Sequence, residues 1–171
     1  MAKFLPALDD RLMAFINAQR MFFTGSAPRE GRVNVSPKGL DCFRVLSSTR
    51  VGYLDLTGSG NETAAHLLEN GRLTFMFCAF EGPPLILRLY AHGRSVQPHH
   101  AEWSELRTYF GPPMPGERQL IIARSKACRP PADMGCRSMR SKRTASSFMH
   151  GLSAKALRVS LNTAKRRIAS A

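Results

Sequence analysis

The chain opens with a helical pattern of hydrophobic positions. Leu8, Leu12, Phe15 and Ile16 lie at i, i+4, i+7 and i+8, with polar residues between them. This spacing predicts an amphipathic helix over residues 8–19. Two more segments have helical composition. They are residues 64–69, which follow a Ser59/Glu62 capping box and end at Asn70-Gly71, and residues 103–110.

Short runs typical of strands dominate the rest of the first 122 residues. Residues 32–36 alternate polar and apolar side chains, the pattern of a half-buried strand. Regular alternation of strands with helices is missing, which argues against a doubly wound fold. Short strands at hairpin-like spacing favour a small antiparallel barrel. The predicted strands are residues 21–24, 32–36, 41–46, 50–56, 73–78, 85–90 and 118–122.

The positive charge is concentrated at one end of the chain. The 171 residues carry a formal net charge of +13. Residues 1–123 contribute only +2 of this charge, whereas residues 124–171 hold 12 Lys and Arg and a single acidic residue, Asp133. A nucleic-acid-binding domain would gather its cations among aromatic residues on a structured face, and the first 123 residues show no such cluster. The charge distribution therefore argues against nucleic acid as a partner.

Cysteine and histidine spacing gives no sign of a metal site. The four cysteines form no C-x-x-C pair, and no histidine stands at zinc-finger spacing. His99-His100 lacks a nearby third ligand. Acidic and basic residues at positions 9–11 interrupt any signal-peptide core, and no apolar run approaches the roughly 18 residues of a membrane span. We expect a cytoplasmic protein with no membrane segment and no disulfide framework.

Two glycine-containing turns carry the most informative chemistry. Gly58-Ser59-Gly60-Asn61 lies between a predicted strand and a helix start, where free N–H groups favour an anion. It lacks the Gly-Lys-Ser/Thr of a P-loop and the third glycine of a dinucleotide fingerprint. The second turn, Ser36-Pro37-Lys38-Gly39, places a hydroxyl and an ammonium at a strand end. Either turn is also compatible with a plain capped or solvated turn.

Taken in order, longer stretches around these turns resemble a known family. They run from Val33 to Gly39, from Tyr53 to Leu67, over Asn70-Gly71-Arg72, from Met76 to Pro84, over Arg88-Leu89-Tyr90 and from Gly116 to Ile122. This order of motifs resembles the pyridoxamine 5′-phosphate oxidase-like, FMN-binding split-barrel proteins. The resemblance covers roughly residues 8–122.

The resemblance implies a mainly β (α+β) fold, a six-stranded antiparallel Greek-key split barrel with a few short helices. It further implies a homodimer with FMN at the subunit interface. Ser36 and Lys38 would hold the phosphate or ribityl chain from one side. The full set of implied cofactor-binding residues is Val35, Ser36, Pro37 and Lys38, with Gly58, Ser59, Gly60, Asn61 and Thr63.

Function follows less directly than fold, because one fold hosts many reactions. We expect an FMN-binding, oxidoreductase-like protein acting on an unknown small molecule. A barrel that binds flavin or another phosphorylated ligand without turnover is the alternative, and a nucleic-acid-binding protein acting through its basic tail is a second one. No base–nucleophile pair is visible, so no catalytic residue is named. Other polar candidates, Asp55, His66 and Arg88, are equally compatible with ordinary structural roles.

The segment after residue 122 departs from the family pattern. Family members usually continue with a stretch similar to V-Q-T-S-C-G-Y-G-V-P. The residues from Ala127 onward can be back-translated into their possible codons. When the last base of each codon is read together with the first two bases of the next codon, the resulting triplets permit that stretch in full. We therefore predict a split-barrel domain at residues 1–122, a frameshift near residues 122–124, and a basic, poorly structured tail at residues 123–171. A shortened last strand would leave an open barrel edge.

Overall fold

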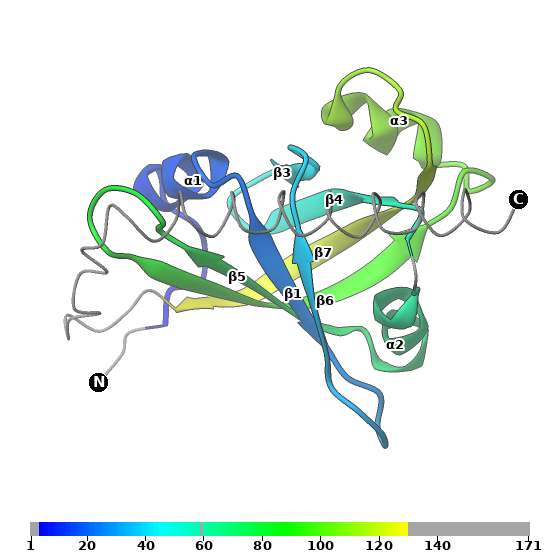
Figure 1. Ribbon diagram of the computed structural model, residues 1–171, viewed down its shortest axis with the longest axis horizontal. Helices are drawn as coiled ribbons and strands as arrows, with labels where there is room; N and C mark the ends of the chain where they lie inside the picture. Colours follow the sequence, from blue (N-terminus) through cyan, green and yellow to red (C-terminus); the bar gives the residue numbers. More distant parts are fainter. Residues whose placement is uncertain (1–3, 59, 130–171) are drawn as a thin grey trace, which may run out of the picture. The chain divides into compact units, whose positions relative to one another are not determined.

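In the part of the chain that the structure describes, seven strands form one sheet, and every paired neighbour in it is antiparallel. The computed structural model describes residues 4–58 and 60–129 (Figure 1). The strand order is β2-β1-β5-β6-β7-β4-β3, so β2 and β3, which follow each other in the chain, lie at opposite edges of the sheet. The mainly β split-barrel fold is confirmed. The sheet has seven strands rather than six, because the short β3 also joins it.

The predicted elements are found at nearly the predicted places. All seven strand segments and all three helices are present, although several bounds move. The strands are β1 Phe22–Ser26, β2 Asn34–Lys38, β3 Phe43–Val45, β4 Arg50–Leu56, β5 Arg72–Cys78, β6 Ile86–Val96 and β7 Glu117–Arg129. The helices are α1 Asp10–Asn17, α2 Glu62–Asn70 and α3 Trp103–Arg107, the last followed by a 3₁₀ turn at Thr108–Phe110.

The helices begin and end for local reasons. Asp9 caps α1 by accepting a hydrogen bond from the Leu12 N–H at 2.8 Å. Gly71 ends α2 with a φ of 67°, in the left-handed region that favours glycine. Asn61 occupies the capping position of α2, and its side chain makes no capping hydrogen bond. The predicted Ser59/Glu62 capping box depends on Ser59, which lies outside the described residues.

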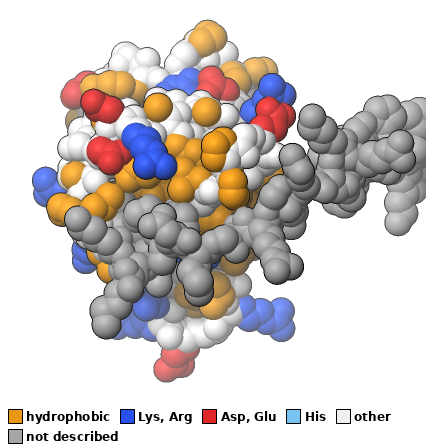
Figure 2. Space-filling model, turned by 90° about the vertical axis from the view of Figure 1, so that its left-hand side faces the viewer, with side chains coloured by type: hydrophobic (Ala, Val, Ile, Leu, Met, Phe, Trp, Pro, Cys, Tyr) orange, Lys and Arg blue, Asp and Glu red, His pale blue; other side chains and the backbone are white. Residues whose placement is uncertain are grey.

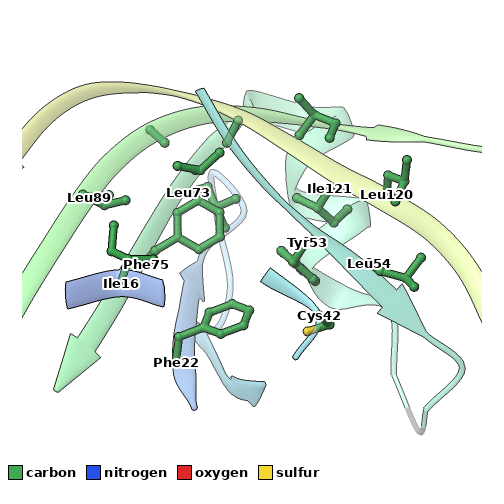
Figure 3. Close-up of a cluster of buried hydrophobic side chains, with 14 of the residues drawn as sticks. Ile16, Phe22, Cys42, Tyr53, Leu54, Leu73, Phe75, Leu89, Leu120 and Ile121 are labelled. Atoms are coloured by element: carbon green, nitrogen blue, oxygen red, sulfur yellow. The ribbon is translucent and has the colours of Figure 1, made fainter. Parts of the chain in front are cut away.

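The core is built largely from aromatic and branched side chains. Tyr53, Phe75 and Phe77 are almost completely buried, and the ring of Phe22 lies 5.7 Å from that of Tyr53. Figure 3 shows Phe22, Tyr53 and Phe75 converging from three different strands. Burial of each such side chain stabilises the fold by about 1.5–3 kcal/mol. This cluster fixes β1, β4 and β5 relative to one another.

Strand β2 reverses the usual division of polar and apolar faces. Its inward-facing side chains are the polar Asn34, Ser36 and Lys38, paired in register with Ser26, Thr24 and Phe22 of β1. The apolar Val33 and Val35 are instead 71% and 62% exposed. The prediction of a strand here is confirmed, but its buried face is the polar one. A polar face turned inward at the edge of a sheet is a candidate ligand-binding site.

Strand β7 is longer than the sequence suggests. The prediction that the last strand is cut short near Ile122 is wrong, because β7 continues to Arg129. Its second half pairs with β6 as far as Arg88↔Arg129, with a register shift between Tyr90 and Ala91. Residues 130–171, which include most of the predicted tail, lie outside the described residues.

The described surface mixes charges of both signs. Figure 2 shows Lys or Arg and Asp or Glu side chains around an apolar area on one face, with no large single-sign patch there. Within residues 4–58 and 60–129, no helix is long and apolar enough to cross a membrane. All these residues belong to one compact unit of the chain.

Candidate functional site

The two stretches singled out in the sequence meet beside strand β2. Asn34 of β2 donates a hydrogen bond to the Thr63 hydroxyl in the first turn of α2, at 3.2 Å. The amide of Asn34 also hydrogen-bonds with the hydroxyl of Ser36. Farther along β2, Lys38 Nζ lies 2.9 Å from Asp55 Oδ1 on β4. Side chains therefore connect β2 to the helix α2 and to β4, a strand with which β2 does not pair in the sheet.

Asp55 is the centre of a buried ionic network. Its carboxylate is 4% exposed and forms ion pairs with Lys38 through Oδ1 and with Arg118 through Oδ2, the latter at 2.7 Å. Gln119 Nε2 also donates to Oδ2, at 2.8 Å. Burial opposes ionisation, but the hydrogen bonds from Gln119, Lys38 and Arg118 outweigh it and lower the pKa of Asp55. The carboxylate is therefore ionised, and the network has two cations for one anion.

A β-bulge explains how two consecutive residues of β7 reach the same carboxylate. Successive side chains of a regular strand point to opposite faces. The register of β4 with β7 shifts after Asp55↔Gln119, so that Leu56 pairs with Glu117 and Arg118 becomes the extra residue. Bulges of this kind redirect side chains. Both Arg118 and Gln119 consequently contact Asp55.

The network extends to the start of α2. Gln119 Nε2 donates to Asn61 Oδ1 at 2.7 Å, and Arg118 Nη2 donates to the carbonyl oxygen of Gly60 at 3.1 Å. The exposed Glu62 carboxylate lies against Gly60, so that a Cβ at this glycine would overlap it. The positive end of α2 and the Arg118 guanidinium thus lie beside Gly60 and Asn61, together with the Glu62 carboxylate. An anionic group such as a phosphate suits this donor set.

A buried tyrosine lies next to this network. The Lys38 Nζ is 5.4 Å from the centre of the Tyr53 ring. The Tyr53 hydroxyl is buried and has no partner in hydrogen-bonding geometry among the described residues. Burial, reinforced by the Asp55 charge, raises the pKa of Tyr53, while the nearby Thr63 hydroxyl opposes part of this rise. Tyr53 is therefore neutral and has a hydroxyl that the described fold leaves unpaired.

The structure brings together some of the predicted cofactor-binding residues and separates others. Ser36, Lys38, Gly60, Asn61 and Thr63 all belong to the network described above. Ser36, Pro37 and Lys38 lie within strand β2, so the prediction that they form a turn is wrong. Val35 and Pro37 face away from the network, Gly58 is exposed, and Ser59 lies outside the described residues.

Sequence reasoning missed Asn34, Arg118 and Gln119. Asn34 could have been found from the alternation of β2, had the polar face been considered as the inner one. Nothing in the local sequence distinguishes Arg118 and Gln119 from the start of an ordinary strand. Their roles depend on the β-bulge and on contacts more than 50 positions away. Asp55 is buried rather than facing solvent.

The remaining candidates have ordinary surroundings. His66 Nδ1 lies 3.0 Å from the Ser26 hydroxyl, which joins α2 to β1. His100 accepts a hydrogen bond from the Gln97 N–H within a loop. Burial raises the pKa of the Cys42 thiol to about 11, so this thiol is protonated and unreactive at neutral pH. Within the described ranges, no group of three or more His, Cys, Asp or Glu could hold a metal ion.

Comparison with known proteins identifies related sequences. The family model described as pyridoxamine 5′-phosphate oxidase matches residues 8–129. The pyridoxamine 5′-phosphate oxidase family protein ustO of Aspergillus flavus is 44% identical over 125 residues, which make up 71% of this chain and 48% of that relative. The chain therefore spans about half the length of this curated relative. The family match, like β7, continues to Arg129.

Solved structures share the fold at low sequence identity. HupZ from Group A Streptococcus matches with a TM-score of 0.58 and 16% identity, over 71% of this chain and 91% of HupZ. An FMN-binding protein from Syntrophomonas wolfei matches with a TM-score of 0.52 and 12% identity, over 73% of this chain and 85% of that protein. These likenesses establish the arrangement of the strands.

Proposed function

Because the chain belongs to the pyridoxamine 5′-phosphate oxidase family, we propose that it binds FMN and acts as an FMN-dependent oxidoreductase on a small molecule. The single observation that carries this proposal is the network at the start of α2. It places two cations and several hydrogen-bond donors around one ionised carboxylate. The resulting excess of positive charge suits the phosphate of FMN better than it suits a neutral ligand.

The chain's own residues supply binding and orientation in this proposal. Lys38 contributes a point charge, and the hydroxyls of Ser36 and Thr63 contribute hydrogen bonds. Gly60 and Asn61 form the start of α2, where backbone N–H groups favour an anion. Participation of Val35, Pro37, Gly58 and Ser59 remains a prediction from the family resemblance. When bound, FMN would supply the redox chemistry, which agrees with the lack of an evident nucleophile or general base.

We further propose that the protein acts as a homodimer in the cytoplasm. Val33 and Val35 expose apolar side chains along the edge strand β2. An edge strand with an apolar outer face is a ready surface for pairing with a second chain. A solved relative in fold is described as an FMN-binding protein, which supports the choice of FMN as cofactor.

An FMN titration of the full chain, followed by quenching of flavin fluorescence, tests the proposal. We expect saturable quenching, and we expect Lys38→Ala to weaken FMN affinity about tenfold, the value of one charge-assisted hydrogen bond. Arg11→Ala, on the exposed face of α1, removes a positive charge away from the network and should leave the affinity unchanged. Equal loss in both variants would indicate nonspecific attraction rather than a site.

A second measurement separates the oxidoreductase from a barrel that binds flavin without turnover. Bound FMN is reduced chemically and its reoxidation is followed by absorbance in the presence of candidate small-molecule acceptors. Acceleration by an acceptor supports the oxidoreductase. Binding without any acceptor-dependent reoxidation favours the non-catalytic alternative.

A further inference from the structure

Gln119 has an amide that uses its full hydrogen-bonding capacity inside the protein. Its side chain is 0% exposed. The two Nε2 hydrogens go to Asp55 Oδ2 at 2.8 Å and to Asn61 Oδ1 at 2.7 Å. The Oε1 atom accepts from the Ser95 hydroxyl at 2.6 Å and from Gln97 Nε2 at 2.9 Å. A side-chain amide offers two donor hydrogens and two acceptor lone pairs, so none is left over.

These four partners fix the orientation of the amide. In the reversed orientation, Oε1 would face the Asp55 carboxylate and the Asn61 oxygen, and Nε2 would face the Gln97 nitrogen. Each of these three contacts would then bring two acceptors or two donors together. Ser95 of β6 and the adjacent Gln97 therefore determine, through Gln119, which atoms are presented to Asp55 and Asn61.

The consequence appears at the start of α2. Asparagine at a capping position normally accepts a hydrogen bond from a backbone N–H in the first helical turn. Asn61 occupies that position without making this bond, because its Oδ1 accepts from Gln119 instead. Among the described residues, no side chain accepts from the N–H groups of Thr63 and Ala64. The buried Tyr53 hydroxyl near Thr63 is likewise unpaired.

We propose that Gln119 is a positioning residue that holds the Asn61 oxygen away from the helix and so keeps the first turn of α2 open to an anionic ligand. The Asn61 amide nitrogen, which has no partner among the described residues, then becomes an additional donor for that ligand. The assignment rests on the proposed FMN site. It adds to that proposal a residue that does not itself touch the ligand.

The first test needs no ligand. In the full chain, backbone hydrogen exchange at Thr63 and Ala64 reports whether Asn61 caps the helix. Gln119→Met frees the Asn61 oxygen, which should then cap α2 and slow exchange at these amides about fivefold. Asn61→Ala, a change at an exposed position, should leave the wild-type rates within about twofold, because the wild-type Asn61 side chain makes no capping hydrogen bond that could be lost. Faster exchange by about fivefold in Asn61→Ala would show that Asn61 caps α2 in solution and would overturn the proposal.

The second test measures coupling in FMN affinity. We expect Gln119→Met to weaken FMN binding about tenfold in the wild-type background and by less than about threefold in the Asn61→Ala background. A merely structural role of Gln119 would give the same loss in both backgrounds, with a matching fall in melting temperature. Equal losses would therefore overturn the proposal.

The two tests distinguish the two possible failures. If the wild-type chain does not bind FMN, the proposed function is wrong, and the exchange rates still decide whether Gln119 controls Asn61. If FMN binds but the exchange rates contradict the orientation of Asn61, the proposed function stands and the role of Gln119 is wrong.

Discussion

Asp55 illustrates how single residues balance charge in this fold. A buried carboxylate is costly unless cations and donors compensate it. Here Lys38, Arg118 and Gln119 all do so. Removing the carboxylate would leave two partly buried cations without a counter-charge, and loss of one partner in such a network typically costs several kcal/mol.

We expect Asp55→Asn to lower the free energy of unfolding by about 3 kcal/mol in urea denaturation at pH 7. Asp41→Asn is the matched control, because Asp41 is 89% exposed in its pair with Arg44 and surface pairs contribute at most about 1 kcal/mol. Similar losses in the two variants would contradict the central place given to Asp55. An anion such as phosphate should recover part of the stability of Asp55→Asn by neutralising the exposed cations.

The pH dependence of this contribution has a definite sign. The folded-state pKa of Asp55 lies below its ordinary value of 3.8. The ionised group therefore stabilises the fold fully above the unfolded pKa, and this stabilisation is lost as the pH falls through the folded pKa. Accordingly, the stability difference between the wild type and Asp55→Asn should be constant between about pH 5 and 7 and should shrink below about pH 4.

At the scale of elements, the end of α2 depends on one glycine. Gly71 combines a φ of +67° with a position against the His92 ring, so that a Cβ would overlap that ring. We expect Gly71→Ala to lower the free energy of unfolding by about 2 kcal/mol. Gly82→Ala, at a φ of +76° with nothing within 4 Å, isolates the backbone cost of about 1 kcal/mol. Recovery of the difference by His92→Ala in the Gly71→Ala background, measured by urea denaturation, would identify the steric part.

Local sequence was sufficient to predict most elements but not how they face one another. The spacing of Leu8, Leu12 and Ile16 predicts α1 because the same side chains that define its pattern are buried. The alternation of β2 also predicts a strand, yet Val35 faces out and Ser36 faces in. Side-chain contacts of β2 with β4 and with the first turn of α2 make its polar face the inner one. The positions of the site residues in β7 depend equally on a bulge that no local pattern reveals.

At the scale of the whole molecule, the outward apolar face of β2 predicts self-association. We expect the wild type to sediment as a dimer, and Val35→Lys to shift it toward the monomer by at least about tenfold in dissociation constant, as expected for a charge in an apolar contact. Leu68→Lys is the control, because Leu68 is an equally apolar side chain that is 85% exposed but belongs to α2 rather than to β2. A wild-type chain that sediments as a monomer at micromolar concentration would contradict the proposed dimer.

The strongly basic segment after β7 raises the question of whether it contributes to the fold or to binding. The described residues up to Arg129 form a seven-stranded sheet, and the family match also ends at Arg129. We propose that the frameshift predicted near residues 122–124 puts the tail out of frame, although the family match runs past that point to Arg129, and sequencing of the coding DNA tests this directly. A chain ended after Pro131 should then keep the melting temperature of the full chain within about 3 °C, equivalent to less than about 1 kcal/mol, and should bind FMN equally well.

The full chain should also bind DNA only weakly and with strong salt dependence, as expected for unspecific attraction of a basic segment. Loss of folding in the shortened chain would show that the segment supports the barrel. Tight, salt-resistant DNA binding lost on shortening would favour a nucleic-acid-binding function instead.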